Sequence, residues 1–267
     1  VVFRSWMRQQ LCCGWNSWAT MATERREAVE LMRRSLSCLV NRKLTMGFQS
    51  WLGANAADAV AQGQRGFNGF TRGTMLASAP DQVMAGYAVT AKIKALAPPD
   101  EPADVVRARR MAYYRAMAEG PKPSIAVVED EDFPNCIGAY WGEVNTTVHK
   151  GFGMSGALTN GVMRDLGDMA PNFPVVAGSI GPSHGFVHVT ELGTPVKIFG
   201  LTVAHGDFVH TDRHGAVVIP PEVLPKLGAA LETMFAAEKI VLEPAREEGF
   251  DFEAFEKAWS AFEKART

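Results

Sequence analysis

Two short motifs in this chain carry residue types that could bind a small anionic substrate and a divalent ion. One is Trp-Gly-Glu at 141–143, and the other is Arg164 with Asp165, at the end of the apolar run 157–163. A carboxylate such as Asp165 suits a hard divalent ion, and an arginine can bind a substrate carboxylate through two parallel hydrogen bonds. If a helix begins at Gly142, its free backbone N–H groups offer an anion site. The simpler alternative is a solvated charge pair at a strand end, worth ~0 to 1 kcal/mol.

The elements around these motifs alternate between strands and helices, which is typical of a layered α/β domain. Apolar runs predict strands at 83–96, 124–130, 156–161, 173–180, 195–203, 207–212 and 215–220. Amphipathic or capped segments predict helices at 104–120, 139–153, 221–237 and after residue 251. An aromatic stripe on the last helix is expected in the core or in a subunit contact: Phe252, Phe255, Trp259 and Phe262.

Composition divides the chain into four parts: a helical repeat-like extension at 1–53, a linker at 54–79, an α/β domain at 80–240 and a C-terminal helix at 241–267. The extension repeats Gly-Trp-Asn-Ser-Trp (14–18) as Gly-Phe-Gln-Ser-Trp (47–51), which suggests strung helical units. Residues 1–52 hold eight Lys/Arg against three Asp/Glu, a net charge of +5, whereas the rest of the chain holds 19 against 26, or −7. The extension therefore differs from the rest of the chain in net charge and in its repeated sequence.

Several classes of protein are disfavoured by what the sequence lacks. The composition, 47% hydrophobic and 21% charged, is that of an ordinary globular protein. The sequence has no phosphate-binding glycine loop, no nucleophile elbow and no zinc-protease motif. No apolar run approaches the ~20 residues needed to span a bilayer. We therefore expect a soluble protein of the cytoplasm or an organelle interior, without nucleic-acid or membrane partners.

The run YWGEVNTTVHKGFGMSGALTNGVMRDLGDM, followed by PVVAGSIGPSHGFVHVTELGTPVKIFGLTVAHGDFVHTDRHGAVVIP, carries a clear resemblance. It resembles the RraA-like family, which includes the divalent-metal 4-hydroxy-4-methyl-2-oxoglutarate aldolases. The resemblance covers roughly residues 75–235 and none of the first 55. It rests on the spacing between the acid at Glu143 and the Arg-Asp pair, together with the ending G-D-x-V-x-x-D-x-x-G-x-V-V-I-P.

The resemblance implies a layered swivelling-domain fold, assembled as a homotrimer or hexamer with active sites at subunit interfaces. It implies that Asp165 holds Mg²⁺ or Mn²⁺ and that Arg164 contacts the pyruvyl group of the substrate. The acid matching Glu143 orders metal-bound water in the aldolases. The backbone of four consecutive residues would receive the substrate carboxylate: Gly142, Glu143, Val144 and Asn145.

The implied activity is that of a metal-dependent lyase. It would cleave 4-hydroxy-2-oxo acids to pyruvate and could also decarboxylate oxaloacetate. One alternative is a non-catalytic RraA-like protein that regulates a ribonuclease by protein contact. Another is a scaffold whose function lies in residues 1–53, which weakly resemble Sfi1-type repeats and would bind a calcium-binding protein.

This chain departs from the family pattern near the predicted site. Glu143 stands where the characterised aldolases have aspartate, which moves the carboxylate by about a bond length. Asn160 stands where relatives commonly carry an acid, so we expect a negative charge near the metal to be absent. With Asp165 facing the ion and Arg164 facing the substrate, a salt bridge between those two residues would indicate an idle site.

Overall fold

An eight-stranded sheet forms the centre of the part that the computed structural model describes, residues 69–266 apart from 74 and 223. The extension at 1–53 and the first part of the predicted linker lie outside the described residues. The strands run in the order β1-β7-β5-β3-β2-β12-β13, and β9 also pairs with β2. Their bounds are β1 (Leu76–Ala77), β2 (Met84–Lys94), β3 (Ser124–Asp130), β5 (Gly156–Thr159), β7 (Val175–Ala177), β9 (His188–Leu192), β12 (Phe208–Asp212) and β13 (Gly215–Ile219).

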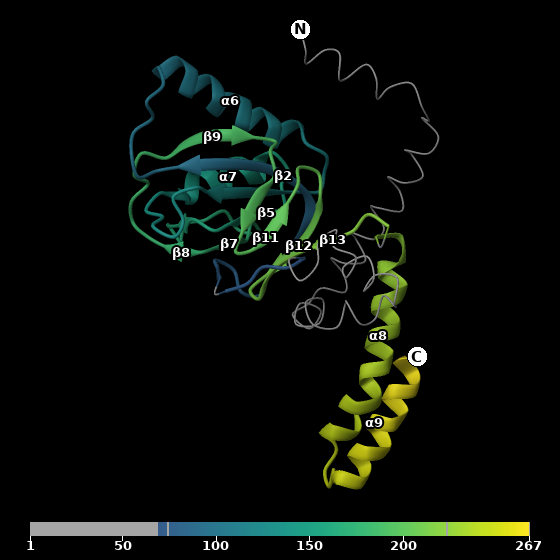
Figure 1. Ribbon diagram of the computed structural model, residues 1–267. Helices are drawn as coiled ribbons and strands as arrows, with labels where there is room; N and C mark the ends of the chain where they lie inside the picture. Colours follow the sequence, from purple (N-terminus) through teal and green to yellow (C-terminus); the bar gives the residue numbers. More distant parts are fainter. Residues whose placement is uncertain (1–68, 74, 223, 267) are drawn as a thin grey trace, which may run out of the picture.

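Strands β2, β3, β5 and β7 are parallel, and the remaining pairings of this sheet are antiparallel. Helix α6 (Ala103–Glu119) connects β2 to β3, and helix α7 (Glu143–Gly151) lies between β3 and β5. The expected layered α/β fold is therefore confirmed, as Figure 1 shows.

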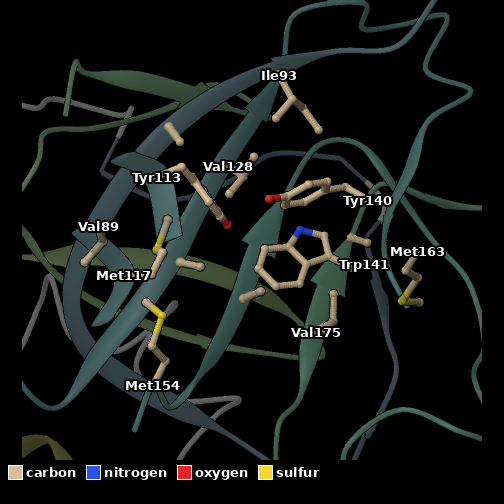
Figure 2. Packing of buried hydrophobic residues seen from close by; sticks show 14 of the residues in the cluster. Val89, Ile93, Tyr113, Met117, Val128, Tyr140, Trp141, Met154, Met163 and Val175 are labelled. Carbon is tan, nitrogen blue, oxygen red and sulfur yellow. The ribbon is translucent and has the colours of Figure 1, made fainter. Parts of the chain in front are cut away.

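Side chains that alternate along the central strands fill two apolar layers, one on each face of the sheet. On β3, Ala126 and Val128 enter one layer, while Ile125 and Val127 enter the other. Tyr113 of α6 belongs to the first layer, which Figure 2 shows from close by. The short strands β10 (Val196–Ile198) and β11 (Leu201–Val203) close the second layer.

The helix predicted at 139–153 is wrong in its first residues, which form part of a small parallel sheet. The strand order of this sheet is β4-β6-β8. Its strands are β4 (Ala139–Trp141), β6 (Val162–Met163) and β8 (Ser179–Ile180). The start of the predicted helix is strand β4, and α7 begins only at Glu143. Gly142 separates the two elements, with an extended backbone at φ −148°. A strand of three residues gives too short an apolar run for its period to be read.

The strands predicted at 173–180 and 195–203 each divide in two. The second is a hairpin, because Phe199 and Gly200 take positive φ angles of 45° and 85° and reverse the chain between β10 and β11. Two parts of the predicted linker pair with the sheet: Phe70 bridges Val217, and β1 (Leu76–Ala77) pairs with β7.

Helices α8 (Leu227–Leu242) and α9 (Phe252–Arg266) pack on each other and form a hairpin that extends from the α/β domain (Figure 1). The predicted boundary at residue 240 falls inside α8. On α9 the predicted aromatic residues contact one another in a row, with ring centroids 5.3–6.1 Å apart. Phe252 is 74% exposed and Trp259 is 41% exposed. The stripe is therefore not part of the domain core.

Candidate active site at the edge of the small parallel sheet

The small parallel sheet brings the two predicted motifs together. Strands β4 and β6 are parallel, so the residues that follow each of them emerge at the same edge. Gly142 and Glu143 follow β4, and Arg164 and Asp165 follow β6. The N–H group of Arg164 donates a 2.8 Å hydrogen bond to the carbonyl oxygen of Trp141, which joins the two strand ends directly.

Gly142 allows this close approach because it has no side chain. A Cβ atom at this position would lie 2.4 Å from Asp165 Oδ2 and 3.0 Å from both Cγ and Nε of Arg164. The backbone of Gly142 is extended, so another residue could adopt its dihedral angles. The requirement for glycine is therefore one of space.

The first turn of α7 presents backbone N–H groups to this edge. Gly142 is the N-cap and supplies no side-chain cap, and the N–H group of Glu143 donates instead to Asp165 Oδ2 at 3.1 Å. The N–H groups of Val144 and Asn145 have no intrahelical carbonyl partner, as is general for a first turn. Such a turn attracts anions through its N–H groups and the helix dipole.

Arg164 and Asp165 contact each other, so the expected separation of the two side chains is not observed. Arg164 Nε lies 3.4 Å from Asp165 Oδ2. That distance exceeds the usual 2.7–3.2 Å of an N–H···O hydrogen bond, and buried Nε has no hydrogen-bond partner among the described residues. Both side chains are about one-third exposed, so the pair is worth ~0 to 1 kcal/mol. This ion pair is the contact that we expected of an inactive site. Because the pair is weak, a ligand can replace it at a small cost in free energy.

The other predicted residues differ in their exposure and in which of their atoms are free to bind a ligand. Glu143 is exposed, and in the described part of the chain its carboxylate makes no hydrogen bond or ion pair. Val144 is 69% exposed. The side chain of Asn145 turns into the domain, where Nδ2 donates to the carbonyl oxygen of Tyr140 at 2.6 Å and Oδ1 accepts from the Tyr114 hydroxyl at 2.8 Å. Only the backbone of Asn145 can serve a ligand.

Asn160 has a structural task that the sequence did not indicate. Its Oδ1 accepts from the N–H group of Asp130 at 2.7 Å, and its Nδ2 donates to the carbonyl oxygen of the same residue at 3.0 Å. Both residues are buried, and burial raises the pKa of the Asp130 carboxyl. An amide can both accept and donate, whereas a carboxylate cannot, so asparagine fits this position better than an acid.

Replacing Asn160 with aspartate is expected to lower the free energy of unfolding by about 3 kcal/mol, because it removes a buried hydrogen bond and adds a charge beside Asp130. Asn172→Asp makes the same chemical change at an exposed position and should be nearly neutral. Urea unfolding of the two variants measures the difference. Equal stability of both would show that the amide of Asn160 is not required.

The sequence did not indicate the role of a buried histidine on the inner face of α7. His149 Nδ1 lies 2.6 Å from the carbonyl oxygen of Asn145, and Nε2 lies 2.7 Å from the Tyr113 hydroxyl. A carbonyl oxygen only accepts, so Nδ1 carries the hydrogen and Nε2 accepts from Tyr113. Burial lowers the pKa of His149 to about 4. The available signal was an asparagine and a histidine four residues apart, which share one face of a helix.

The buried histidines predict how stability depends on pH. Burial lowers the pKa of both His149 and His210 to about 4, while an unfolded histidine titrates near 6.5. The unfolded chain then binds more protons, so the free energy of unfolding falls as the pH drops from about 6.5 toward 4, by up to roughly 1.4 kcal/mol per pH unit per histidine. The raised pKa of Asp130 acts in the opposite direction.

Urea unfolding at pH 7, 6 and 5 measures this slope. His210→Leu should make it shallower, because it removes one of the two histidines whose pKa burial lowers to about 4. Exposed His184 provides the control, since His184→Ala should leave the slope as it is. A slope in His210→Leu equal to that of the parent chain would contradict the assignment.

The donor set fits a hydrated divalent ion and does not fit a metal enclosed by protein ligands. Within the described residues, no three or more His, Cys, Asp or Glu side chains gather to hold a metal. Mg²⁺ commonly binds to one or two carboxylates and keeps several waters and substrate oxygens. The contacts of the Asp165 carboxylate with Glu143 N–H and with Arg164 both use Oδ2, so Oδ1 can bind such an ion.

No described helix is long and apolar enough to cross a membrane.

Curated relatives of this chain match only parts of it. The uncharacterized protein MJ0644 of Methanocaldococcus jannaschii is 34% identical over 91 residues, which are 33% of this chain and 44% of that protein. Protein DlpA of Legionella pneumophila is 27% identical over 158 residues, 55% of this chain and 25% of its own length. The chain thus spans less than half the length of either relative.

Solved structures share the fold at low sequence identity. An uncharacterized protein from Pseudomonas syringae superposes with a TM-score of 0.58 at 18% identity, covering 88% of this chain and 93% of that one. RraAS2 of Streptomyces coelicolor, described as an unusual member of the RNase ES inhibitor RraA protein family, gives 0.56 at 17% identity, covering 80% and 94%.

A family model described as "RraA-like: Aldolase/RraA" matches residues 54–218, more than half of the chain. The match begins upstream of the first described residue and ends in β13. It includes both motifs that meet at the edge of the small sheet. The chain belongs to the RraA-like family.

Proposed function

We propose that this chain is a divalent-metal-dependent lyase that cleaves 4-hydroxy-2-oxo acids to pyruvate. The observation that supports it is the meeting of Arg164, Asp165 and the first turn of α7 at one edge, joined by the hydrogen bond from Glu143 N–H to Asp165. A cation, a carboxylate and free N–H groups together suit a substrate with adjacent ketone and carboxylate groups.

Each group has a distinct role in this proposal. The N–H groups of Val144 and Asn145 bind the substrate carboxylate, and the guanidinium of Arg164 lies against the ketone oxygen, where negative charge develops as the carbon–carbon bond breaks. Asp165 would hold Mg²⁺ or Mn²⁺, which would supply Lewis-acid polarisation of the ketone. The exposed carboxylate of Glu143 orders the water through which a proton moves.

The reaction balances with the substrate alone. Cleavage of 4-hydroxy-4-methyl-2-oxoglutarate between C3 and C4 leaves the electron pair on the pyruvyl carbon, while the 4-hydroxyl group loses its proton and becomes the ketone of a second pyruvate. The pyruvyl carbon then takes up a proton. Decarboxylation of oxaloacetate releases CO₂ and leaves the same electron pair, so Arg164 would stabilise the same charge in both reactions.

Metal removal tests the proposal. Purified protein with Mg²⁺ should release pyruvate from oxaloacetate, and excess EDTA should lower the rate to the protein-free background because the ketone is no longer polarised. Adding Mn²⁺ or Mg²⁺ beyond the chelator should restore the rate. Protein-dependent release that EDTA leaves unchanged would contradict a metal-dependent mechanism.

We also propose assembly as a homotrimer or hexamer. Large apolar side chains beside the site are exposed, with Val144 at 69%, Leu166 at 46% and Ile180 at 52%, and surfaces of this kind commonly mark protein contacts. The same surface supports the alternative, a non-catalytic protein that regulates a ribonuclease by contact. Complete inactivity with both substrates, combined with inhibition of a ribonuclease, would favour that alternative.

A further inference from the structure

Helix α7 is tied to the domain interior by hydrogen bonds inside a layer that is otherwise apolar. Asn145 links the helix to Tyr140 of β4 and Tyr114 of α6, and His149 links it to Tyr113 of α6. His149 and Tyr113 have no measurable exposure. The connections thus run from the first two turns of α7 to both elements that flank it.

These hydrogen bonds lie on both sides of Gly142, the residue that allows the two motifs to approach each other. Tyr140 and Trp141 immediately precede Gly142, and the ring of Trp141 lies 4.8 Å from the ring of His149. Asn145 lies one turn after Gly142. Figure 2 shows Tyr113, Tyr140 and Trp141 side by side in this layer. The peptide groups at Gly142 are therefore held from the strand side and from the helix side.

An apolar residue at 149 would fill the same space but would not define the rotation of α7 about its axis. Directional hydrogen bonds do define it, and a fully satisfied buried network favours one arrangement. The N–H group of Glu143 reaches Asp165 at 3.1 Å, close to the outer limit of a good hydrogen bond. A small rotation of the helix would break it.

We propose that Tyr113, Asn145 and His149 are positioning residues that hold the first turn of α7 where its N–H groups meet Asp165 and a ligand carboxylate. The inference rests on the proposed function of the same site. None of the three side chains touches substrate: Asn145 contributes only backbone to the site, and the other two act through the helix.

The test compares Tyr113→Phe, which removes one hydroxyl group, and His149→Leu with Val203→Ala in the full chain. Val203 is buried in the apolar layer on the opposite face of the sheet, so its truncation loosens the fold without touching α7. Amide hydrogen exchange across 143–148 and the kcat and KM for oxaloacetate are measured for each variant.

Both network variants should speed exchange at 143–146 by about tenfold more than in the rest of the chain, and should lower kcat/KM by about 10- to 100-fold. Val203→Ala should speed exchange evenly and leave kcat/KM nearly unchanged. Exchange at 143–146 that matches Val203→Ala would overturn the inference.

The two readouts separate this inference from the proposed function. If the parent chain releases no pyruvate, the proposed function fails, and hydrogen exchange still decides whether the network holds α7. If the parent chain is active and the network variants behave like Val203→Ala in both measurements, the proposed function stands and the inference fails.

Discussion

Replacing Arg164 with alanine is expected to lower kcat/KM for oxaloacetate by about 10²- to 10³-fold, the usual cost of removing a preorganised group that stabilises developing negative charge. The guanidinium stands beside Asp165 and Gly142, and among the described residues no other arginine or lysine forms an ion pair with Asp165. Most of the loss should appear in kcat, because the charge on the ketone oxygen is largest in the transition state.

Arg164→Lys provides the matched control for charge. Lysine keeps the positive charge but presents a point charge in place of a planar fork, so it should recover only part of the activity. Both variants should unfold close to the parent midpoint, since the ion pair with Asp165 is weak. Full activity in Arg164→Ala would remove arginine from the mechanism.

Gly142→Ala is expected to reduce activity by about 100-fold or more although it adds a single methyl group. The new Cβ would lie 2.4 Å from Asp165 Oδ2, so the carboxylate must move away from the N–H group of Glu143. A displacement of about 1 Å at a reacting site can cost that much in rate. The backbone of Gly142 is extended and accepts alanine, so the fold should survive.

Gly151→Ala makes the same change at the other end of α7. A Cβ at Gly151 meets nothing within 4 Å, so activity should stay at the parent level and stability should be equal or higher by up to about 1 kcal/mol. Steady-state kinetics and urea unfolding of the pair separate a clash at the site from a general effect on the helix. Parent-level activity in Gly142→Ala would contradict the described geometry.

The parts of the fold that could be predicted are those with long, regular patterns. Strand β3 contains a continuous apolar run at 125–128, and α6 begins and ends close to the predicted positions. Strands β1, β6 and β8 have two residues each, too few for a hydrophobic period to be recognised. The predicted helix at 139–153 includes β4 because the aromatic residues of this strand lead directly into α7. Such short strands form because they pair with strands that are distant in sequence.

For the site, the sequence indicated both motifs and an anion site at a helix start, but not the small parallel sheet that brings the motifs to one edge. The spacing could not show that Arg164 and Asp165 contact each other, since neighbours in a chain can point apart or together. The task of Asn160 depends on the peptide group of Asp130, and that of His149 on Tyr113, more than 20 residues away in each case. Hydrogen-bond partners of this kind follow only from the three-dimensional arrangement.

The most direct test of the proposed lyase is pyruvate release from 4-hydroxy-4-methyl-2-oxoglutarate in Mg²⁺, measured for the parent chain beside Asp165→Asn. Asparagine keeps the shape of Asp165 but lacks the charge that a hard divalent ion requires. We predict metal-dependent pyruvate release by the parent chain and a loss of at least about 100-fold in Asp165→Asn. Release by the variant at the parent rate, or none by either protein above the metal-only background, would contradict the assignment of this site.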